Sequence, residues 1–368
     1  MKILLSGGGT AGHINPAVAI AGYSVQRDSK NSALFVGTKK GLESTLVPKE
    51  GYNIEYVDVD GLSGKIGFKT AVSACKMAIA TAKCIGIARR FKPDVVVGTG
   101  GYVCVPAVMA AYVLGIPSVI HEQNVFPGSA VKFLESRASR TAISFEESRR
   151  YLKGGNVVLT GNPIRPSILS RTGDRCKESL GLGGKKLIVC FGGSLGANAI
   201  NDVMTDFIAD NSENNDIAVY FATGRRDFER VMNIVREKKI RLGKNIKILE
   251  YIDNMDVVMN AADVLICRSG AITLAEICAL GKPSVLVPSP NVTHNHQEYN
   301  ARALSDNGAA ITICEKDFNE KSLSDALFPL IYDSERAVRM SAEAKKLGIT
   351  DATEKIYSLM ENLVKASR

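Results

Sequence analysis

Several residue types and patterns are scarce in this 368-residue sequence, and each scarcity narrows its possible functions. Aromatic residues make up only 6%, and tryptophan is absent. Because proteins bind single-stranded nucleic acids largely by stacking bases on aromatic rings, and no known binding-module pattern is present, we expect no nucleic-acid partner. No apolar run approaches the ~20 residues that cross a bilayer, and the start MKILLSGGG lacks the apolar region and cleavage site of a signal peptide. We therefore expect a cytosolic protein.

The eight cysteines include no C-x-x-C pair. Most of them lie in apolar strand or helix patterns such as LIVCFGG and VLICRSG. This placement favours buried free thiols over disulfides or a zinc site in a chain of this size. The sequence also lacks the G-x-x-x-x-G-K-[ST] loop that cradles the phosphates of ATP in one large class of nucleotide-binding proteins.

Acidic residues are missing between Asp60 and Asp94, and the whole net charge of +8 falls in residues 1–163. Between Asp60 and Asp94, lysines and arginines are interleaved with apolar residues. The pattern is typical of a helix at an anionic membrane surface, although a solvated helix face would produce it too. The residues expected to contact the membrane are Lys65, Ile66, Phe68, Lys69, Lys76 and Lys83.

Short apolar segments alternate with helical stretches along the entire chain. The first series of expected strands covers residues 2–5, 33–36, 54–58, 94–98, 117–121, 141–144 and 156–159. The second covers 185–193, 217–223, 246–252, 262–270, 283–290 and 309–314. Such βα alternation predicts the α/β class, with a doubly wound parallel sheet in each of two Rossmann-like domains. The stretch TGNPIRPSIL places the domain boundary near residue 163, because its two prolines interrupt regular structure.

Three glycine-rich turns follow expected strands: SGGGTAGH (6–13), GTGGYVCVP (98–106) and FGGSLGAN (191–198). The first and third also open a helix, whose exposed amides and positive dipole end attract anions. Any one of them could be a plain tight turn. Three at corresponding strand ends favour a diphosphate-bearing ligand, in a cleft between the two domains. NAD fits less well, because the second strand ends in LFVGT without an acid for the ribose.

All four histidines lie beside glycine-rich or asparagine-rich turns. His13, at the end of the first glycine loop, could act as a general base or simply bond a neighbouring loop at a helix start. In HEQNVFPG (121–128), Glu122, Gln123 and Asn124 suit sugar hydroxyls, although a polar turn would also contain them. The pair His294 and His296 lacks a nearby carboxylate or cysteine, so a polar loop is favoured over a metal site.

The segment CRSGAITLAEICALGKPSVLVPSPNVTHNHQEYNARAL (267–304) is the most specific of the chain. A strand ends at Cys267, a turn begins a helix, and Glu276 follows one to two turns into that helix. Amides at the helix start can hold a diphosphate, while a carboxylate at this depth can accept both hydroxyls of a ribose. A solvent-facing glutamate on an ordinary helix is the alternative.

Seven motifs in order, GGTAGHINP, GTGGYV, HEQN, GNPIR, GGSLGA, RSGAITLAE and HQEYNARAL, resemble the GT-B family of UDP-N-acetylglucosamine:lipid I N-acetylglucosaminyltransferases, the MurG family of peptidoglycan synthesis. The resemblance covers essentially the whole chain. It implies an inverting transfer of GlcNAc from UDP-GlcNAc to lipid I, without a required cofactor or metal. It also implies a peripheral protein at the cytoplasmic face of the cell membrane, with other cell-wall synthesis proteins as further partners.

The same resemblance implies a division of labour among domains. Residues 1–163 would bind the acceptor and face the membrane, residues 164–346 would bind UDP-GlcNAc, and a last helix in 347–368 would pack back on the first domain. His13 is the implied base. The residues implied to bind UDP-GlcNAc are Thr10, Ala11, Gly12, Asn124, Arg165, Ser194, Ile252, Ala271, Ile272, Thr273, Leu274, Ala275, Glu276 and Gln297.

Particular roles follow from the family pattern. Ser194 and the turn at 271–273 would hold the diphosphate, and Glu276 the ribose. The backbone of Ile252 would contact the uracil, and Arg165 would lie near the nucleotide. Asn124 and Gln297 would bond the GlcNAc hydroxyls.

The sequence departs from the family pattern at Cys104 and at Ala130-Val131, which we expect on the acceptor or sugar side. Two other classes of function remain open. A different GT-B glycolipid glycosyltransferase or a nucleotide-sugar epimerase would share the donor-binding residues, and a non-catalytic UDP-sugar-binding membrane scaffold would not need His13.

Overall fold

The computed structural model describes residues 1–61, 68–193 and 195–367. The chain forms two compact units: an N-terminal unit of Met1–Ile164 and Ile349–Arg368, and a C-terminal unit of Arg165–Gly348. These limits differ by one or two residues from those expected from the sequence. Residue 347 ends a helix of the C-terminal unit rather than beginning the final segment.

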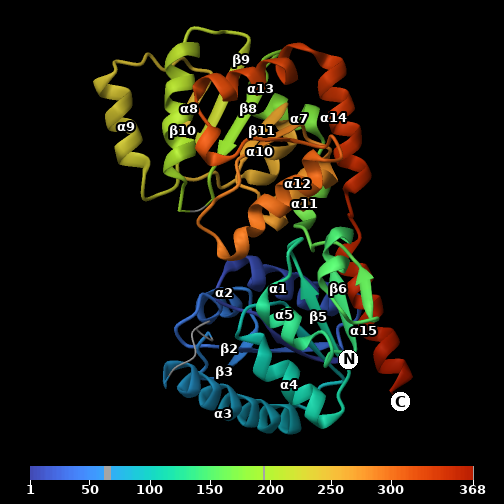
Figure 1. Ribbon diagram of the computed structural model, residues 1–368. Helices are drawn as coiled ribbons and strands as arrows, with labels where there is room; N and C mark the ends of the chain where they lie inside the picture. The colour runs from blue at the N-terminus through green and yellow to red at the C-terminus, as the bar shows by residue number, and fades with distance from the viewer. Residues whose placement is uncertain (62–67, 194, 368) are drawn as a thin grey trace. The chain divides into compact units, whose positions relative to one another are not determined.

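The N-terminal unit is built on a seven-stranded parallel sheet of order β3-β2-β1-β4-β5-β6-β7 (Figure 1). Its strands are β1 (Lys2–Ser6), β2 (Ser32–Gly37), β3 (Asn53–Tyr56), β4 (Val95–Gly98), β5 (Ser118–Glu122), β6 (Arg140–Ile143) and β7 (Val157–Leu159). Its helices are α1 (Ala11–Arg27), α2 (Glu43–Lys49), α3 (Phe68–Phe91), α4 (Cys104–Leu114), α5 (Ser129–Leu134), the 3-10 helix η1 (Glu146–Tyr151) and α15 (Ala352–Ala366).

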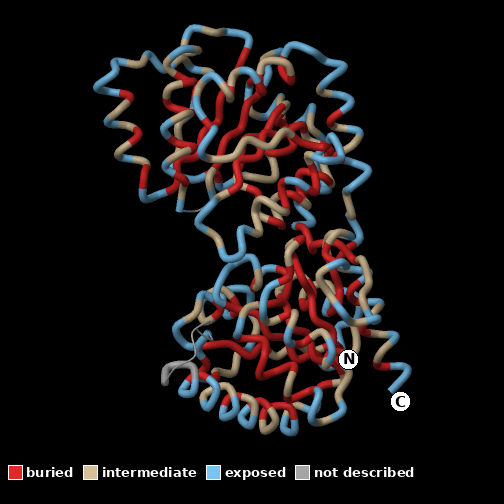
Figure 2. The backbone as a smooth tube through the Cα atoms, viewed as in Figure 1, coloured by how far each residue is buried: buried red, intermediate tan, exposed pale blue. Residues whose placement is uncertain are grey.

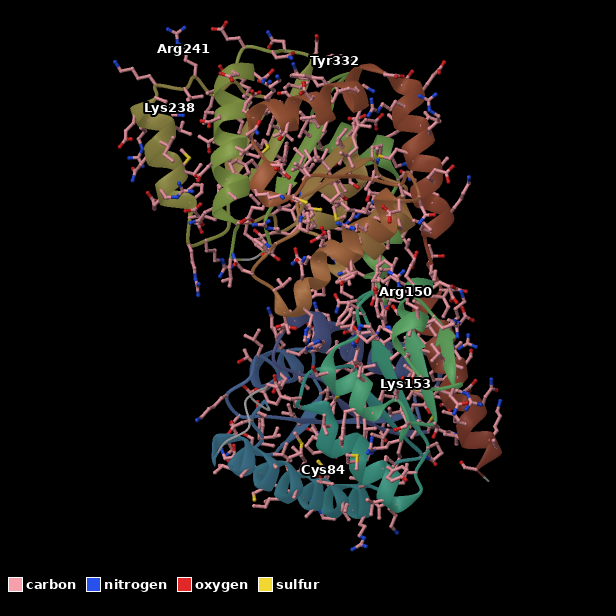
Figure 3. The ribbon with its side chains drawn as sticks, in the orientation of Figure 1. Cys84, Arg150, Lys153, Lys238, Arg241 and Tyr332 are labelled. Carbon is pink, nitrogen blue, oxygen red and sulfur yellow. The ribbon has the colours of Figure 1, made fainter. Side chains whose placement is uncertain are left out.

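Helices cover both faces of this sheet, because successive strand side chains point to opposite sides. Ile3 and Leu5 of β1 pack in a core with α1 and α15, whereas Leu4 packs in a second core with α3 and α4. Cys84, on the side of α3 that faces α4, belongs to this second core (Figure 3). Nearly continuous apolar strands are what a doubly covered parallel sheet requires.

The C-terminal unit repeats the arrangement on a six-stranded parallel sheet of order β10-β9-β8-β11-β12-β13. Its strands are β8 (Lys186–Phe191), β9 (Ile217–Ala222), β10 (Ile246–Leu249), β11 (Val264–Cys267), β12 (Ser284–Leu286) and β13 (Ile311–Thr312). Its helices are α6 (Pro166–Leu169), α7 (Gly173–Ser179), α8 (Asn198–Asn211), α9 (Phe228–Glu237), α10 (Met255–Ala261), α11 (Ala271–Leu280), η2 (Thr293–Asn295), α12 (His296–Ser305), η3 (Glu315–Asp317), α13 (Glu320–Tyr332) and α14 (Ser334–Leu347).

The final helix, α15, packs against the N-terminal unit. Its residues Ile356 and Met360 are fully buried in the core that also contains α1. Tyr357 meets Tyr23 edge to face with ring centroids 5.5 Å apart, and its hydroxyl accepts a hydrogen bond of 3.2 Å from Asn31. The last helix of the chain therefore packs in the core on one face of the first sheet, although it follows the C-terminal unit in sequence.

In both sheets the strand order reverses at one point, between β1 and β4 and between β8 and β11. Ligands of open α/β sheets bind beside such a reversal, at the carboxyl ends of the strands. The loops at these four strand ends are the three glycine-rich turns and the turn before α11. The predicted class, two doubly wound Rossmann-like sheets, is confirmed, and each sheet carries two of the candidate loops.

Helix α3 differs from the prediction that no segment is long and apolar enough to cross a bilayer. By length and composition alone, Ala71–Phe91 passes that test, with 28% of its most apolar window buried. Val72 and Ile79 are exposed, as is Lys83, and Figure 2 shows the exposed side running along the helix. Of the expected membrane contacts, Lys65 and Ile66 lie outside the described residues, and so do the side chains of Phe68 and Lys69.

Candidate functional site

His13 lies in the first turn of α1, directly after the first glycine loop. Its Nδ1 is 2.9 Å from the carbonyl oxygen of Gly8 and 3.3 Å from Oγ1 of Thr10. Because a carbonyl can only accept, Nδ1 carries the hydrogen in this contact, and the neutral ring keeps its basic lone pair on Nε2. Local backbone thus selects the tautomer that a base needs.

The second glycine loop, after β4, packs directly on this imidazole. A Cβ at Gly100 would lie 2.7 Å from Cδ2 of His13, and one at Gly101 would lie 2.5 Å from the carbonyl oxygen of Gly8. Both glycines have positive φ, +110° and +73°, which side chains disfavour. These glycines therefore fit the loop against a histidine, in addition to any contact with a ligand.

A buried polar network underlies the same loop. Nε2 of Gln123 donates to the carbonyl of Thr99 (2.8 Å), whose hydroxyl donates to the carbonyl of His13 (2.7 Å). Nδ1 of His121 accepts from Gln123 (2.9 Å), and its Nε2 donates to the carbonyl of Gly161 (3.0 Å). Burial lowers the pKa of His121 to about 4, so this ring is neutral at pH 7. The network ties the candidate base to the centre of the sheet.

The idea that Glu122 and Gln123 face sugar hydroxyls is wrong, because both are buried. The carboxylate of Glu122 accepts hydrogen bonds from the backbone amides of Asn124 (2.9 Å) and Gly128 (2.8 Å), and burial raises its pKa. It also accepts from the side-chain amide of Asn124 (3.2 Å). Asn124 is half-buried at the end of this turn and is the residue of the three that lies nearest the surface.

The two departures from the family pattern are also inside the core. Cys104 is 1% exposed and its Sγ lies 3.1 Å from the carbonyl oxygen of Gly101. Burial raises the pKa of its thiol to about 12. Val131 is buried, and Ala130 packs against the same core. These side chains therefore affect packing under the loops, and their place on the acceptor or sugar side stays a prediction.

The C-terminal unit holds a cavity of about 700 Å³ at the carboxyl ends of β8 and β11. Its walls are the third glycine loop with the start of α8, the turn leading into α11, and the segment from Ser289 to Gln297. Of the predicted donor-binding residues, Thr273 and Gln297 line it. Ser194 belongs to the same loop but lies outside the described residues. The cavity has a volume suited to a small-molecule ligand.

The first turn of α11 faces this cavity through Gly270 and Thr273. Gly270 is its N-cap, and the amides and positive dipole end at a helix start favour an anion placed there. Thr10, Ala11 and Gly12 are exposed at the corresponding helix start of the N-terminal unit.

Side chains along α11 point in different directions. Leu274 is fully buried and Ala271 is buried, so a ligand would meet only their backbone; Ile272 and Ala275 are half-buried. Ile252 is likewise 2% exposed, which fits a role of its backbone alone. Glu276 is not solvent-facing: its carboxylate forms a two-point ion pair with Arg165, with Nε–Oε1 and Nη2–Oε2 distances of 2.8 and 3.0 Å.

Gln297, at the start of α12, has a fixed orientation. Its side-chain oxygen accepts from the amide of Ser289 at 2.9 Å, which turns the NH2 group away as a donor. The neighbouring His296 is held by the carbonyl of Thr293 at 2.9 Å. Among the described residues, no group of three or more His, Cys, Asp or Glu side chains could hold a metal ion.

Two residues that line the cavity, Arg268 and Glu315, were not predicted from the sequence. Their side chains form an ion pair, and Arg268 also donates to the carbonyl of Val287 at 3.0 Å. Arg268 follows β11 directly, as a cation at a strand end beside a glycine turn. A cation in that position could have been recognised as a candidate ligand-binding residue. Its acidic partner, Glu315, could not, because it is 47 residues away in the chain.

Comparison with known proteins agrees with this geometry. Residues 3–143 match the glycosyltransferase family 28 N-terminal domain, and residues 187–356 match its C-terminal domain. The UDP-N-acetylglucosamine–N-acetylmuramyl-(pentapeptide) pyrophosphoryl-undecaprenol N-acetylglucosamine transferase of Acetivibrio thermocellus is 42% identical over 367 residues, 99% of each chain. The protein of the same name from a Thermoanaerobacter species is 44% identical over 365 residues, 99% of this chain and 100% of that one.

Among solved structures, MurG of Acinetobacter baumannii superposes with a TM-score of 0.79 at 25% identity, over 98% of this chain and 99% of that one. The fold, the order of the loops and full-length identity above 40% lead to one conclusion: the chain belongs to the MurG family of N-acetylglucosamine transferases, within glycosyltransferase family 28.

Proposed function

We propose that this chain transfers GlcNAc from UDP-GlcNAc to the C4 hydroxyl of MurNAc in lipid I, undecaprenyl-pyrophosphoryl-MurNAc-pentapeptide, and that His13 is the general base. The reaction gives lipid II for peptidoglycan synthesis. The observation that carries the assignment of the base is the contact of 2.9 Å between Nδ1 of His13 and the carbonyl of Gly8. In the neutral ring this contact puts the basic lone pair on Nε2, the atom that would take the hydroxyl proton.

In this scheme the hydroxyl oxygen attacks the anomeric carbon from the face opposite the diphosphate, so the α-linkage of the donor becomes a β-linkage in the product. The bond from the anomeric carbon to the diphosphate oxygen breaks, and UDP leaves with the electron pair. The amides at the start of α11 and the third glycine loop stabilise the charge that develops on the leaving diphosphate. Protein groups alone carry these steps, and UDP-GlcNAc is the donor substrate.

The diphosphate and GlcNAc of the donor would occupy the cavity of the C-terminal unit, and its nucleoside would extend beyond the lining residues toward Glu276 and Ile252. Thr273 and Ser194 would bond the diphosphate, Glu276 the ribose hydroxyls and the Ile252 backbone the uracil. The NH2 group of Gln297 would donate to a GlcNAc hydroxyl, since its oxygen is already held by Ser289. The acceptor and the residues Thr10, Ala11, Gly12 and Asn124 belong to the N-terminal unit.

The acceptor is membrane-bound, and we assign the membrane contact to α3. The exposed apolar residues Val72 and Ile79 and the exposed Lys83 lie on this helix. Lys76 is a weaker candidate, because its ammonium already pairs with Asp60 at 2.7 Å and Asp58 at 3.4 Å. A helix that combines exposed apolar side chains and lysines binds peripherally at the cytoplasmic, anionic surface.

The experiment that tests the base is transfer of radiolabelled GlcNAc to a lipid I analogue by wild type and His13→Ala, with UDP binding measured by calorimetry. Loss of a general base lowers kcat on the order of 100- to 10,000-fold, while UDP affinity stays nearly unchanged. His296→Ala is the matched control, because that imidazole makes the same contact of 2.9 Å with a backbone carbonyl. A His13→Ala variant with a near-wild-type rate would show that the base lies elsewhere.

A further inference from the structure

Arg165 and Glu276 are joined across 111 residues of sequence by the two-point ion pair described above. Arg165 is the first residue of the C-terminal unit and precedes α6, with extended backbone between Pro163-Ile164 and Pro166. Its side chain is 50% exposed, whereas that of Glu276 is 5% exposed. The carboxylate is thus almost buried, and its charge is balanced by a residue on the connection between the units.

The geometry leaves a defined number of acceptor sites on Glu276. An ionised carboxylate offers about four lone-pair positions, two on each oxygen. The guanidinium uses one position on Oε1 and one on Oε2, because Nε and Nη2 approach different oxygens in parallel. One position remains on each oxygen. Two neighbouring hydroxyl groups, such as the 2′ and 3′ hydroxyls of a ribose, need two neighbouring acceptors, and the two oxygens of one carboxylate supply them.

We propose that Arg165 is a positioning residue that selects ribose through Glu276, by holding the carboxylate in one rotamer. The proposal rests on the proposed function, because it takes the nucleotide ribose as the ligand of Glu276. Arg165 acts on the carboxylate and not on the reacting atoms.

The planar fork of arginine is the part of the side chain that matters. A lysine at this position would supply a positive charge but only a point contact, so the carboxylate could rotate about its terminal torsion. Without any cation, a carboxylate buried to this degree loses the partner that compensates its desolvation. Charge and orientation are therefore separable by substitution.

The test measures discrimination between UDP and 2′-deoxy-UDP by calorimetry for wild type, Arg165→Lys, Arg165→Met and Glu276→Gln. A lost hydrogen bond to a charged group corresponds to roughly a 10- to 100-fold preference of wild type for UDP. We expect Arg165→Met to reduce this preference to within about threefold of unity, and Arg165→Lys to retain only part of it. The Arg165→Met/Glu276→Gln double variant should lose no more than either single variant, since the two act as one unit.

Arg230→Met is the matched control. It removes a two-point pair of the same kind, with Nε–Oδ1 and Nη2–Oδ2 distances of 2.6 and 2.7 Å to the buried Asp227. We expect this variant to keep the wild-type preference for UDP, because weakening the unit in general does not select against one hydroxyl.

Two outcomes would overturn the proposal in distinguishable ways. If Arg165→Met keeps the wild-type preference while Glu276→Gln loses it, Glu276 binds the ribose without help from Arg165. If Glu276→Gln keeps the preference, the ribose lies elsewhere and the donor assignment itself fails. Neither result depends on transfer activity, so the assignment of His13 is tested separately.

Discussion

The two units arrange six strands in the same order, with a seventh added in the N-terminal sheet, but they use their glycine loops differently. In the N-terminal unit the loops after β1 and β4 close on the imidazole of His13, and Gly100 and Gly101 leave room for the ring. In the C-terminal unit the equivalent loops after β8 and β11 surround a cavity of about 700 Å³. The fold fixes where the loops lie, and under the proposed function the side chains at the helix starts give the two places different roles, a base at His13 and an anion site in the C-terminal unit.

Charge separates the units as well. All of the net charge of +8 lies in residues 1–163, while the remainder of the chain is balanced. The C-terminal unit, which is neutral overall, nevertheless has a cationic side chain in the wall of its cavity, Arg268, paired there with Glu315. The net charge of a unit therefore does not describe the charge inside its cavity, which individual side chains set.

The largest effect is expected from Gly100→Ala, which tests whether the glycine loops of the N-terminal unit act on His13 alone. The added Cβ would lie 2.7 Å from the imidazole of His13, at a φ of +110°. Displacing the base should lower kcat by about 100-fold or more while UDP affinity stays within about twofold, since the donor cavity is in the other unit. Kinetics of transfer and calorimetry of UDP binding provide the two readouts.

Gly115→Ala is the control for backbone strain. Gly115 also has a positive φ, +67°, but a Cβ there would meet nothing within 4 Å. We expect it to cost some stability with little change in kcat. Equal losses of kcat in the two variants would mean that strain, and not contact with His13, explains the result.

A smaller effect is expected on stability, which the buried network makes dependent on pH in the N-terminal unit. His121 has its pKa lowered by burial from 6.5 to about 4. Between these values the unfolded chain binds a proton that the folded chain does not, so stability falls as pH falls through this window. The contribution is on the order of 3 kcal/mol and is complete above pH 6.5. Urea unfolding between pH 7 and 4.5 measures it.

His121→Gln isolates this contribution from that of the carboxylates, which titrate in the same range. Glutamine has no group that titrates there, so the stability gap between wild type and variant should narrow as the pH falls. A gap that stays constant from pH 7 to 4.5 would contradict the buried, neutral state of His121.

Much of the fold could be predicted from sequence, for a physical reason. Apolar runs such as KKLIVCFGG ended within about two residues of the observed strands, because doubly covered strands must be apolar throughout. Glycine-rich turns after those runs located the strand ends, and hence the ligand-binding edge. Local patterns carry this information because strands and turns are local structures.

What could not be predicted depends on contacts between distant residues. Glu276 was expected to bind a ribose or to face solvent, and no residue near it in sequence indicates that its partner is Arg165. Glu122 and Gln123 have the composition of a sugar-binding turn, but the sheet places them inside. Polar side chains at strand ends can serve either the ligand or the loop that binds it, and only tertiary structure separates the two.

The smallest effect is expected from removing single exposed lysines, one in the basic N-terminal unit and one in the neutral C-terminal unit. A lysine near an anionic surface contributes about 1 kcal/mol, so Lys83→Ala should weaken partition onto vesicles rich in phosphatidylglycerol about fivefold, and added salt should reduce the difference. Lys321→Ala removes an exposed lysine of α13 in the balanced C-terminal unit and should leave partition unchanged. Sedimentation of the protein with vesicles measures both. Equal losses would mean that binding follows the total charge of the protein and not the face of α3, because only a local contact can distinguish one exposed lysine from another.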